Sequence, residues 1–478
     1  MTEEEKEEKE TDLETAETNE TSNHNPWRVV VIILSALVVL IGLSFLPFEK
    51  LTNGKISDFN LLGEIMERID SDSTEISDGT ELIDPALQEA MLDTRAIDTA
   101  GVAEGEAPLI AVLPSRQGAD MVLEDYTEAG QGLKRMRQSI AQGGVTRVAV
   151  IGDSYIEGDI FTQDLREMLQ TQYGGSGVGY VNMHSDFPGF RRSVKQGGKG
   201  WTEYAANKSA EKRYTGLSQH YFTSTANSTA SYKGTDALPH LDSWDNSQFL
   251  FISPKNSVIK VKTGEGEWVT HNITGSPEVQ AITVNGPTNN FEISTSSPSI
   301  IGLGAWMYGS KGVTVDCMSS RGFSGLTLNN VSGELSNQMS KFVDYDLIVL
   351  EFGINAMSAK QKDFSVYSNR MVDVIKHVRE CFPNADIIMM GIGDRGEKKA
   401  GEVHSMASAP YMVNAQRDAA RRARCLFYDT RESMGGQDAI VSWVGDGLAN
   451  KDYIHLTHKG GRKLAEPFFK AIKADIDK

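Results

Sequence analysis

Short, mostly apolar runs alternate with amphipathic helical patterns through much of the chain, and this alternation restricts the fold more than any other feature. Strands that alternate with such helices form a mostly parallel sheet with helices on both faces. We therefore predict an α/β fold. The strand-like runs are residues 145–154, 313–320, 346–353, 385–393 and 426–430, and the helical patterns are residues 125–141, 161–173, 366–382, 414–425 and a last helix from about Lys459.

Residues 206–312 interrupt this alternation. The segment is rich in Ser, Thr, Asn and Gly, and residues 257–263, 280–286 and 290–296 alternate between apolar and polar side chains. Alternation with a period of two indicates half-buried strands. We predict a β-sandwich insertion here, which would divide the α/β domain into residues 121–205 and 313–478.

An uncharged apolar run extends from Val29 to Leu46. As a helix it is just long enough to span a bilayer. We expect a transmembrane anchor over residues 29–48, after a disordered acidic tail, 1–28, and before a stalk, 49–120. A cleaved signal peptide is the alternative, but no small-x-small cleavage site cleanly follows the run.

The orientation of this anchor does not follow from its flanking charges. Lys6, Lys9 and Arg28 before the run are nearly balanced by Lys50 and Lys55 after it, so the positive-inside rule does not decide. We expect the large C-terminal part to lie outside the cytoplasm, because a single N-terminal anchor commonly serves export.

The chain is acidic, with a formal net charge of -18 and a pI of about 5.0. Nucleic acids and anionic lipids bind basic surfaces, so the charge argues against both as partners. The three cysteines, Cys317, Cys381 and Cys425, have no metal-ligand or disulfide-framework spacing, and we expect buried thiols. We expect neither a metal nor an organic cofactor.

The sequence Gly152-Asp153-Ser154 ends the first predicted strand and precedes a helix. Ligands and reactive groups of open α/β sheets lie at the carboxyl ends of strands, where a serine hydroxyl would be exposed near a helix N-terminus. Ser154 is therefore a candidate nucleophile. A tripeptide this short also fits a simple turn or helix N-cap.

Asp452 and His455 lie just before the last predicted helix. Serine becomes a good nucleophile when a histidine takes its proton and a carboxylate fixes the histidine's tautomer. The spacing of three residues lets both side chains converge from one loop. In isolation, the pair fits a loop aspartate and a surface histidine better than a catalytic pair.

Two further loops carry candidate oxyanion donors. Gly353-Ile354-Asn355 follows one predicted strand, and Ser324-Gly325 comes shortly after another. Acyl transfer develops negative charge on an oxygen, which backbone N–H groups at glycines and side-chain amides stabilise. Each loop taken singly fits an ordinary turn.

Together and in this order, the four segments resemble the blocks of the SGNH (GDSL-like) hydrolase superfamily. The resemblance covers roughly residues 146–205 and 313–478 and implies a flavodoxin-like, three-layer domain. It implies Ser154, His455 and Asp452 as the catalytic triad, and the Ser154 and Gly325 N–H groups and the Asn355 amide as the oxyanion hole. Gly322 is a near alternative to Gly325. Many members have GxND, where this chain has Ala356 after the asparagine.

The stretch from Ile151 to Val181 is similar more narrowly to a bacterial envelope branch that includes peptidoglycan O-acetylesterases with a carbohydrate-binding-module-like insertion. This implies an extracytoplasmic esterase acting on O-acetylated cell-wall or surface carbohydrate. An O-acetyltransferase supplied by a membrane-bound O-acyltransferase partner, and an inactive glycan-binding protein on the same scaffold, remain open. The glycines Gly174, Gly175, Gly177 and Gly179 lack the Lys-Ser/Thr of a phosphate loop, so nucleotide binding is rejected.

Several other polar and aromatic residues have ordinary structural explanations. His404 fits a solvated loop, and Glu157 and Asp159 fit either helix caps or groups that polarise a substrate. Four tryptophans in or beside the insertion fit its core better than a sugar-stacking site; they are Trp201, Trp244, Trp268 and Trp306.

Overall fold

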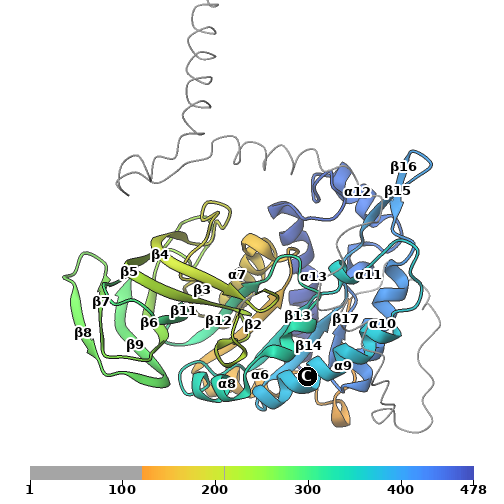
Figure 1. Ribbon diagram of the computed structural model, residues 1–478. Coiled ribbons are helices and arrows are strands. Elements are labelled where there is room, and N and C mark those ends of the chain that lie inside the picture. Colours follow the sequence, from red (N-terminus) through yellow and green to blue (C-terminus); the bar gives the residue numbers. More distant parts are fainter. Residues whose placement is uncertain (1–120, 209) are drawn as a thin grey trace, which may run out of the picture. The chain divides into compact units, whose positions relative to one another are not determined.

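A parallel β-sheet forms the centre of the α/β part (Figure 1). The computed structural model describes residues 121–208 and 210–478, so the predicted tail, membrane anchor and stalk lie outside the described residues. Within these residues the sheet has six strands: β1 (Glu124–Asp125), β2 (Val145–Gly152), β12 (Gly312–Ser319), β13 (Leu347–Glu351), β14 (Asp386–Met390) and β17 (Leu426–Tyr428).

The strands follow the order β1-β17-β14-β13-β2-β12. All neighbours are parallel except β1, which runs antiparallel to β17 at one edge. Without β1, and numbered by chain order, this is the flavodoxin-like order 2-1-3-4-5. The central strands β2 and β13 are buried along almost their whole length, because helices cover both faces. This explains their mostly apolar sequence.

The main helices divide into two groups. In one, α13 (His458–Ile476) packs on α7 (Thr162–Tyr173) and α6 (Lys134–Gln142). In the other, α9 (Ser365–Cys381) packs on α8 (Gly333–Met339) and α10 (Ala409–Arg422). The shorter helices are α11 (Thr430–Met434), α12 (Ala439–Gly445) and the 3-10 turns η1 (Glu128–Gly130), η2 (Glu157–Asp159), η3 (Lys212–Tyr214), η4 (Leu326–Asn330) and η5 (Ile354–Ala356).

A separate antiparallel sheet follows α7 in the chain (Figure 1). Among the described residues it has nine strands, and it includes β3 and β4, which lie before residue 206. The strands are β3 (Gly179–Val181), β4 (Lys195–Ala205), β5 (His220–Lys233), β6 (Trp244–Ser253), β7 (Ser257–Thr263), β8 (Val269–Ile273), β9 (Ser276–Thr288), β10 (Asn290–Thr295) and β11 (Ile301–Tyr308). The prediction of a parallel α/β sheet with a separate antiparallel part is confirmed.

Strand β5 connects the two halves of this sheet. Its residues 228–233 pair with β10, whereas its residues 222–223 pair with β11. Side chains from both halves, such as Phe291 of β10 and Phe249 of β6, enter one common core. The two halves therefore face each other across that core.

The antiparallel sheet is also packed against the α/β part. Successive side chains of β6 point to different cores. Phe249 and Phe251 belong to the core of the antiparallel sheet, and the alternating Leu250 and Ile252 belong to the core of the α/β part. Strand β3 pairs with β11 and also packs on β12 of the parallel sheet. Consequently the two sheets form neighbouring hydrophobic cores that share strands.

Two local features differ from the sequence predictions. The helix predicted over residues 125–141 begins only at Lys134, because β1 and η1 occupy its first part and Gly132 there has a φ of +59°. The loop after β14 contains a hairpin, β15 (Gly396–Lys399) and β16 (Glu402–Ser405). In residues 121–208 and 210–478, no helix combines the length and apolarity needed to cross a membrane.

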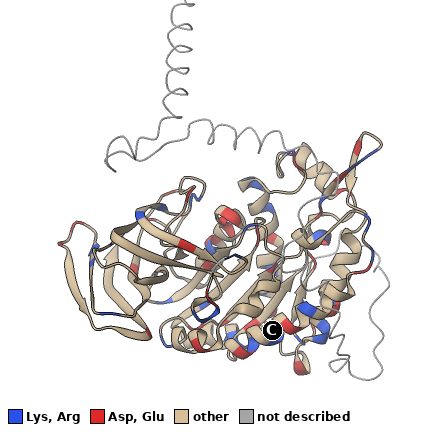
Figure 2. Cartoon of the chain, in the orientation of Figure 1, with Lys and Arg blue, Asp and Glu red and all other residues tan. Residues whose placement is uncertain are grey.

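Charged residues of both signs are intermixed over the helices, and long stretches of the antiparallel strands carry none (Figure 2). The acidic excess of the sequence is therefore not gathered into one acidic face of the helical layers in this view. Some charges of the described part form buried pairs, such as Arg166–Asp159 and Arg431–Asp394.

Candidate active site

Ser154 lies in the turn that follows β2, at the carboxyl edge of the parallel sheet. The backbone N–H of Asp153 donates to the Glu351 carbonyl at the end of β13, 3.3 Å away, and the Glu157 N–H donates to the Ser154 carbonyl. The next regular helix, α7, begins only at Thr162, after η2. The turn itself, rather than a helix N-terminus, therefore holds the serine.

The structure brings Ser154, His455 and Asp452 together in one hydrogen-bonded chain. His455 Nε2 is 2.9 Å from Ser154 Oγ, and His455 Nδ1 is 2.7 Å from Asp452 Oδ2. These residues come from opposite ends of the described sequence and meet because β2 and the loop before α13 reach the same edge of the sheet. This arrangement can pass a proton from the serine hydroxyl to the imidazole.

Asp452 uses its two carboxylate oxygens for different contacts. Oδ1 accepts the backbone N–H groups of Ile454 and His455, and Oδ2 contacts the imidazole. Burial raises the pKa of Asp452, but the hydrogen bonds and the charge of His455 lower it further, so the pKa lies below its usual value. The carboxylate is therefore ionised at neutral pH and keeps Nδ1 of the imidazole protonated.

Asn355 joins the nucleophile turn to the loop that carries Gly325. Its amide nitrogen donates to Asp153 Oδ2 at 3.1 Å and to the Phe323 carbonyl at 3.0 Å. Both neighbours are acceptors, which fixes the orientation of the amide and engages both of its hydrogens. To stabilise an oxyanion, Asn355 would have to exchange one of these bonds for the substrate oxygen.

Gly325 lies directly before η4, packed against the end of β13. Its φ is +91°, and a Cβ at this position would be 2.8 Å from the Phe352 ring. Both the backbone conformation and the lack of space require glycine. Gly322 in the same loop also has a positive φ, but no atom lies within 4 Å of its Cβ position.

A buried pair of carboxyl groups lies beneath the nucleophile, and the sequence did not indicate it. Burial raises the pKa of Asp153 to about 7, although Tyr155, His455 and Arg395 act against this shift. Burial and the neighbouring Asp153 raise the pKa of Glu351 well above its usual value. In the sequence, Asp153 and Glu351 are only neighbours of candidate motif residues. They come close together because β2 pairs with β13.

The antiparallel insertion contacts the loop between β12 and η4. The Gln219 side chain accepts from Thr327 Oγ1 at 2.5 Å and donates to Ser320 Oγ at 3.3 Å. His220 Nε2 is 3.2 Å from the same Ser320 hydroxyl, and its ring stacks on Phe323. The insertion therefore holds the loop that contains Gly325 in place through these contacts.

The remaining residues singled out in the sequence have varied surroundings. His404 is about half exposed on β16, while Asp159 is buried in an ion pair with Arg166. Glu157 pairs with Arg321 at 2.7 Å. Trp201, Trp244 and Trp306 are buried, whereas Trp268 is 40% exposed, and all three cysteines are free and buried.

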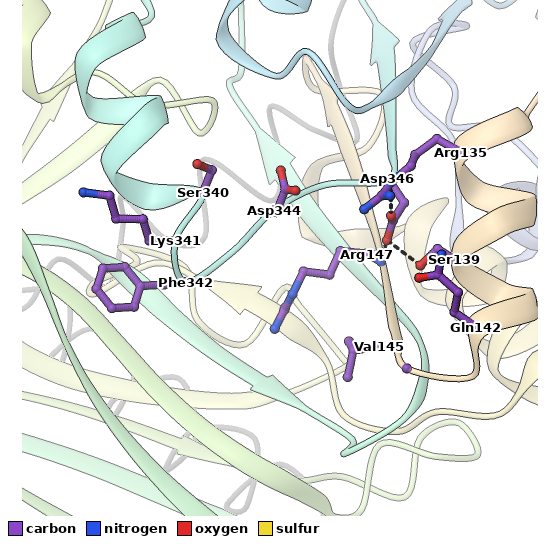
Figure 3. A pocket seen from close by; sticks show the side chains of 11 residues that line it. Arg135, Ser139, Gln142, Val145, Arg147, Ser340, Lys341, Phe342, Asp344 and Asp346 are labelled. Atoms are coloured by element: carbon purple, nitrogen blue, oxygen red, sulfur yellow. Dashed lines mark hydrogen bonds and ion pairs between the residues drawn. The ribbon is translucent and has the colours of Figure 1, made fainter.

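No cluster of His, Cys, Asp or Glu suited to a metal ion occurs among the residues that the structure describes. A cavity of about 300 Å³ lies at the amino edge of the sheet, next to Val145 at the start of β2 (Figure 3). There Asp346 accepts from Arg135 and Ser139 at 2.8 and 2.9 Å. This cavity is at the edge opposite to Ser154, so it does not share the relay.

Comparison with known proteins shows similarity at the level of structure. No family model matches the chain, and no curated protein sequence does so. A solved structure of a peptidoglycan O-acetylesterase is similar with a TM-score of 0.61 and 22% identity, over 74% of this chain and 99% of that one. A family two carbohydrate esterase from Cellvibrio japonicus has a TM-score of 0.27 and 8% identity, over 59% of this chain and 98% of that one. The first of these similarities shows that the two chains share a fold.

Proposed function

We propose that this chain is a serine esterase of the SGNH type that removes O-acetyl groups from a cell-wall or surface carbohydrate. The observation that carries the proposal is the relay of Ser154, His455 and Asp452, with contacts of 2.9 and 2.7 Å. The shared fold with a peptidoglycan O-acetylesterase supports the choice of an acetylated carbohydrate as substrate.

The proposed reaction passes through an acyl-enzyme. His455 takes the Ser154 proton as Oγ attacks the acetyl carbonyl, and the Ser154 and Gly325 N–H groups, with the Asn355 amide, stabilise the oxyanion. His455 then gives the proton to the departing sugar hydroxyl. A water molecule, deprotonated by His455, attacks the acetyl-serine and releases acetate.

Ser154→Ala in the full chain tests this proposal. With p-nitrophenyl acetate as substrate, we expect the variant to lose about a thousandfold or more of the wild-type kcat, because no other group on this relay can hold the acetyl intermediate. Ser442→Ala, at an exposed position in the middle of α12, serves as the matched control. An undiminished rate in Ser154→Ala would contradict the assignment of Ser154 as the nucleophile.

The same relay would also serve an O-acetyltransferase, in which a sugar hydroxyl replaces water and a membrane-bound O-acyltransferase supplies the acetyl group. Both products can be measured in one reaction with an added oligosaccharide. The esterase proposal predicts that acetate release exceeds acetyl transfer at every acceptor concentration. Transfer that overtakes hydrolysis would contradict it.

We also propose that residues 29–46 anchor the protein in a membrane, with the catalytic domain facing the periplasm or the cell exterior. The uncharged apolar sequence of this segment supports the anchor. Protease added to intact cells or spheroplasts should degrade the C-terminal part of the full chain. Complete protection until the membrane is opened would contradict this orientation.

A further inference from the structure

A cavity of about 290 Å³ lies beside the nucleophile turn, between the α/β part and the antiparallel insertion. Its walls come from η2, from the segment that follows β3, from strands β4 and β5, and from the loop after β12. Glu157, close after Ser154, and Phe323, whose carbonyl accepts from Asn355, both line it. The cavity therefore lies next to the candidate active site.

Two exposed aromatic rings line this cavity beside its polar groups. Phe187 is 55% exposed and Phe190 is 47% exposed. Phe190 packs over Gly158, where a Cβ would lie only 2.6 Å from its ring carbons. An exposed ring next to polar groups is suited to the C–H face of a sugar, because stacking removes apolar surface while the hydroxyl groups bind polar partners.

The charged side chains of the cavity are paired with one another. His184 contacts Asp186 at 3.0 Å, Arg191 contacts Asp159 at 3.3 Å, and two further pairs are His220–Glu203 at 2.8 Å and Arg321–Glu157 at 2.7 Å.

Lys208 is the remaining cation of the cavity wall, and it lies near Glu203. The pKa of Glu203 lies below its usual value, mainly because His220 donates a hydrogen bond to it. Burial acts in the opposite direction, and the charges of His220, His184 and Lys208 lower the pKa further. The cavity thus holds nearly equal numbers of positive and negative groups. Such a surface gives little attraction to a polyanion and suits an uncharged ligand with many hydroxyl groups.

We propose that this cavity is a subsite for an uncharged pyranose ring, which stacks on Phe187 and Phe190 and places the acetylated neighbouring ring at Ser154. The inference rests on the proposed esterase function. The substrate would then contain at least two linked sugars. Residues 182–191 and the insertion would bind the glycan directly.

Kinetics of the full chain on substrates of different length test the subsite. The substrates are p-nitrophenyl acetate, O-acetylated N-acetylglucosamine and its O-acetylated β-1,4-linked tetramer. For the double variant Phe187→Ala/Phe190→Ala we expect a KM for the tetramer about tenfold higher or more, with unchanged rates on p-nitrophenyl acetate and the monomer. Trp268→Ala is the control, because that exposed ring lies outside the cavity.

Three outcomes would overturn the subsite. The double variant could hydrolyse the tetramer like the wild type, it could lose the same factor on all three substrates, or the wild type could prefer an O-acetylated oligogalacturonate to the neutral tetramer. Phe187→Tyr/Phe190→Tyr, which keeps both rings, should retain the low KM and so separates stacking from misfolding. Loss of p-nitrophenyl acetate hydrolysis in Ser154→Ala is independent of these results and tests the esterase function alone.

Discussion

Asp452 organises both the loop and the imidazole, so its charge matters more than its size. Asp452→Asn keeps the shape but places an N–H donor or a weaker acceptor against His455 Nδ1, which favours the wrong tautomer. We expect kcat on p-nitrophenyl acetate to fall by about a thousandfold to ten-thousandfold, with little change in melting temperature. Asp446→Asn, an exposed carboxylate of a nearby loop, is the control. A loss of less than tenfold would contradict the role of Asp452.

The buried Asp153 should make stability depend on pH. Its pKa is about 7 in the folded chain against 3.8 ordinarily, so the folded state keeps a proton that the unfolded state releases between these values. Stability from this group is therefore present at low pH and is lost as pH rises through about 7.

Asp153→Asn removes this titration, and the free energy of unfolding of the variant relative to wild type should rise between about pH 4 and pH 8. The new amide donates where the carboxylate accepted, and this lowers the free energy of unfolding by a similar amount at every pH. The change of that free energy with pH is therefore the quantity that tests the prediction. Urea unfolding across this range measures it, with the exposed Asp186→Asn as control. A difference that stays constant with pH would contradict the shifted pKa.

At the scale of elements, the insertion braces the loop that carries Gly325, and Gln219 is the central contact. Gln219→Ala should allow this loop to move and lower kcat on p-nitrophenyl acetate by about tenfold to a hundredfold, while KM changes little. Gln248→Ala, another buried glutamine of the insertion that contacts Thr283, is the matched control. Equal losses in both variants would indicate a general effect on the insertion rather than on the loop.

The elements that the sequence predicted are those with a strong local pattern. Strands β2 and β13 are mostly apolar and α9 has a clear helical period, so their positions followed from the residues alone. Strand β4 was missed because its residues, KQGGKGWTEYA, are mostly exposed and include three glycines. Strand β1 was missed because it has two residues and depends entirely on its pairing with β17.

The contacts of the candidate site likewise include some that the sequence predicted and some that it could not. The approach of Ser154 to His455 could be predicted from their places at strand and loop ends of a parallel sheet. The contacts of Asn355 with Asp153 and Phe323 could not, because they depend on side-chain positions in two neighbouring loops. The role of Gln219 lies even further from any motif, since it depends on how the insertion packs on the α/β part.

At the scale of the whole described unit, the two sheets are joined by strand β6, whose side chains enter both cores, and by one buried aspartate. Asp316 of β12 accepts from Trp306 Nε1 and Tyr345 Oη, both at 2.8 Å, and from the Tyr180 N–H at 3.0 Å. Two of these donors belong to the insertion's strands β11 and β3. Breaking this contact should therefore destabilise both sheets together.

We expect calorimetry to show one unfolding transition for the insertion and the α/β part, shifted by several degrees to lower temperature in Asp316→Ala. Cys317→Ser, at the next residue of the same strand, is the control for a change that leaves the aspartate in place. If the insertion melted separately, with only the lower of two transitions shifted, the shared cores would not act as one cooperative unit.

Acetylation of Ser154 during turnover is the measurement that tests the proposed mechanism most directly. The full chain is mixed with p-nitrophenyl acetate, quenched in acid within the first turnovers and digested for mass spectrometry. The relay predicts one acetyl group on the peptide that contains Ser154 in the wild type and none in Ser154→Ala. Turnover of the ester without acetyl-serine at this position, or an equally labelled Ser154→Ala variant, would contradict it.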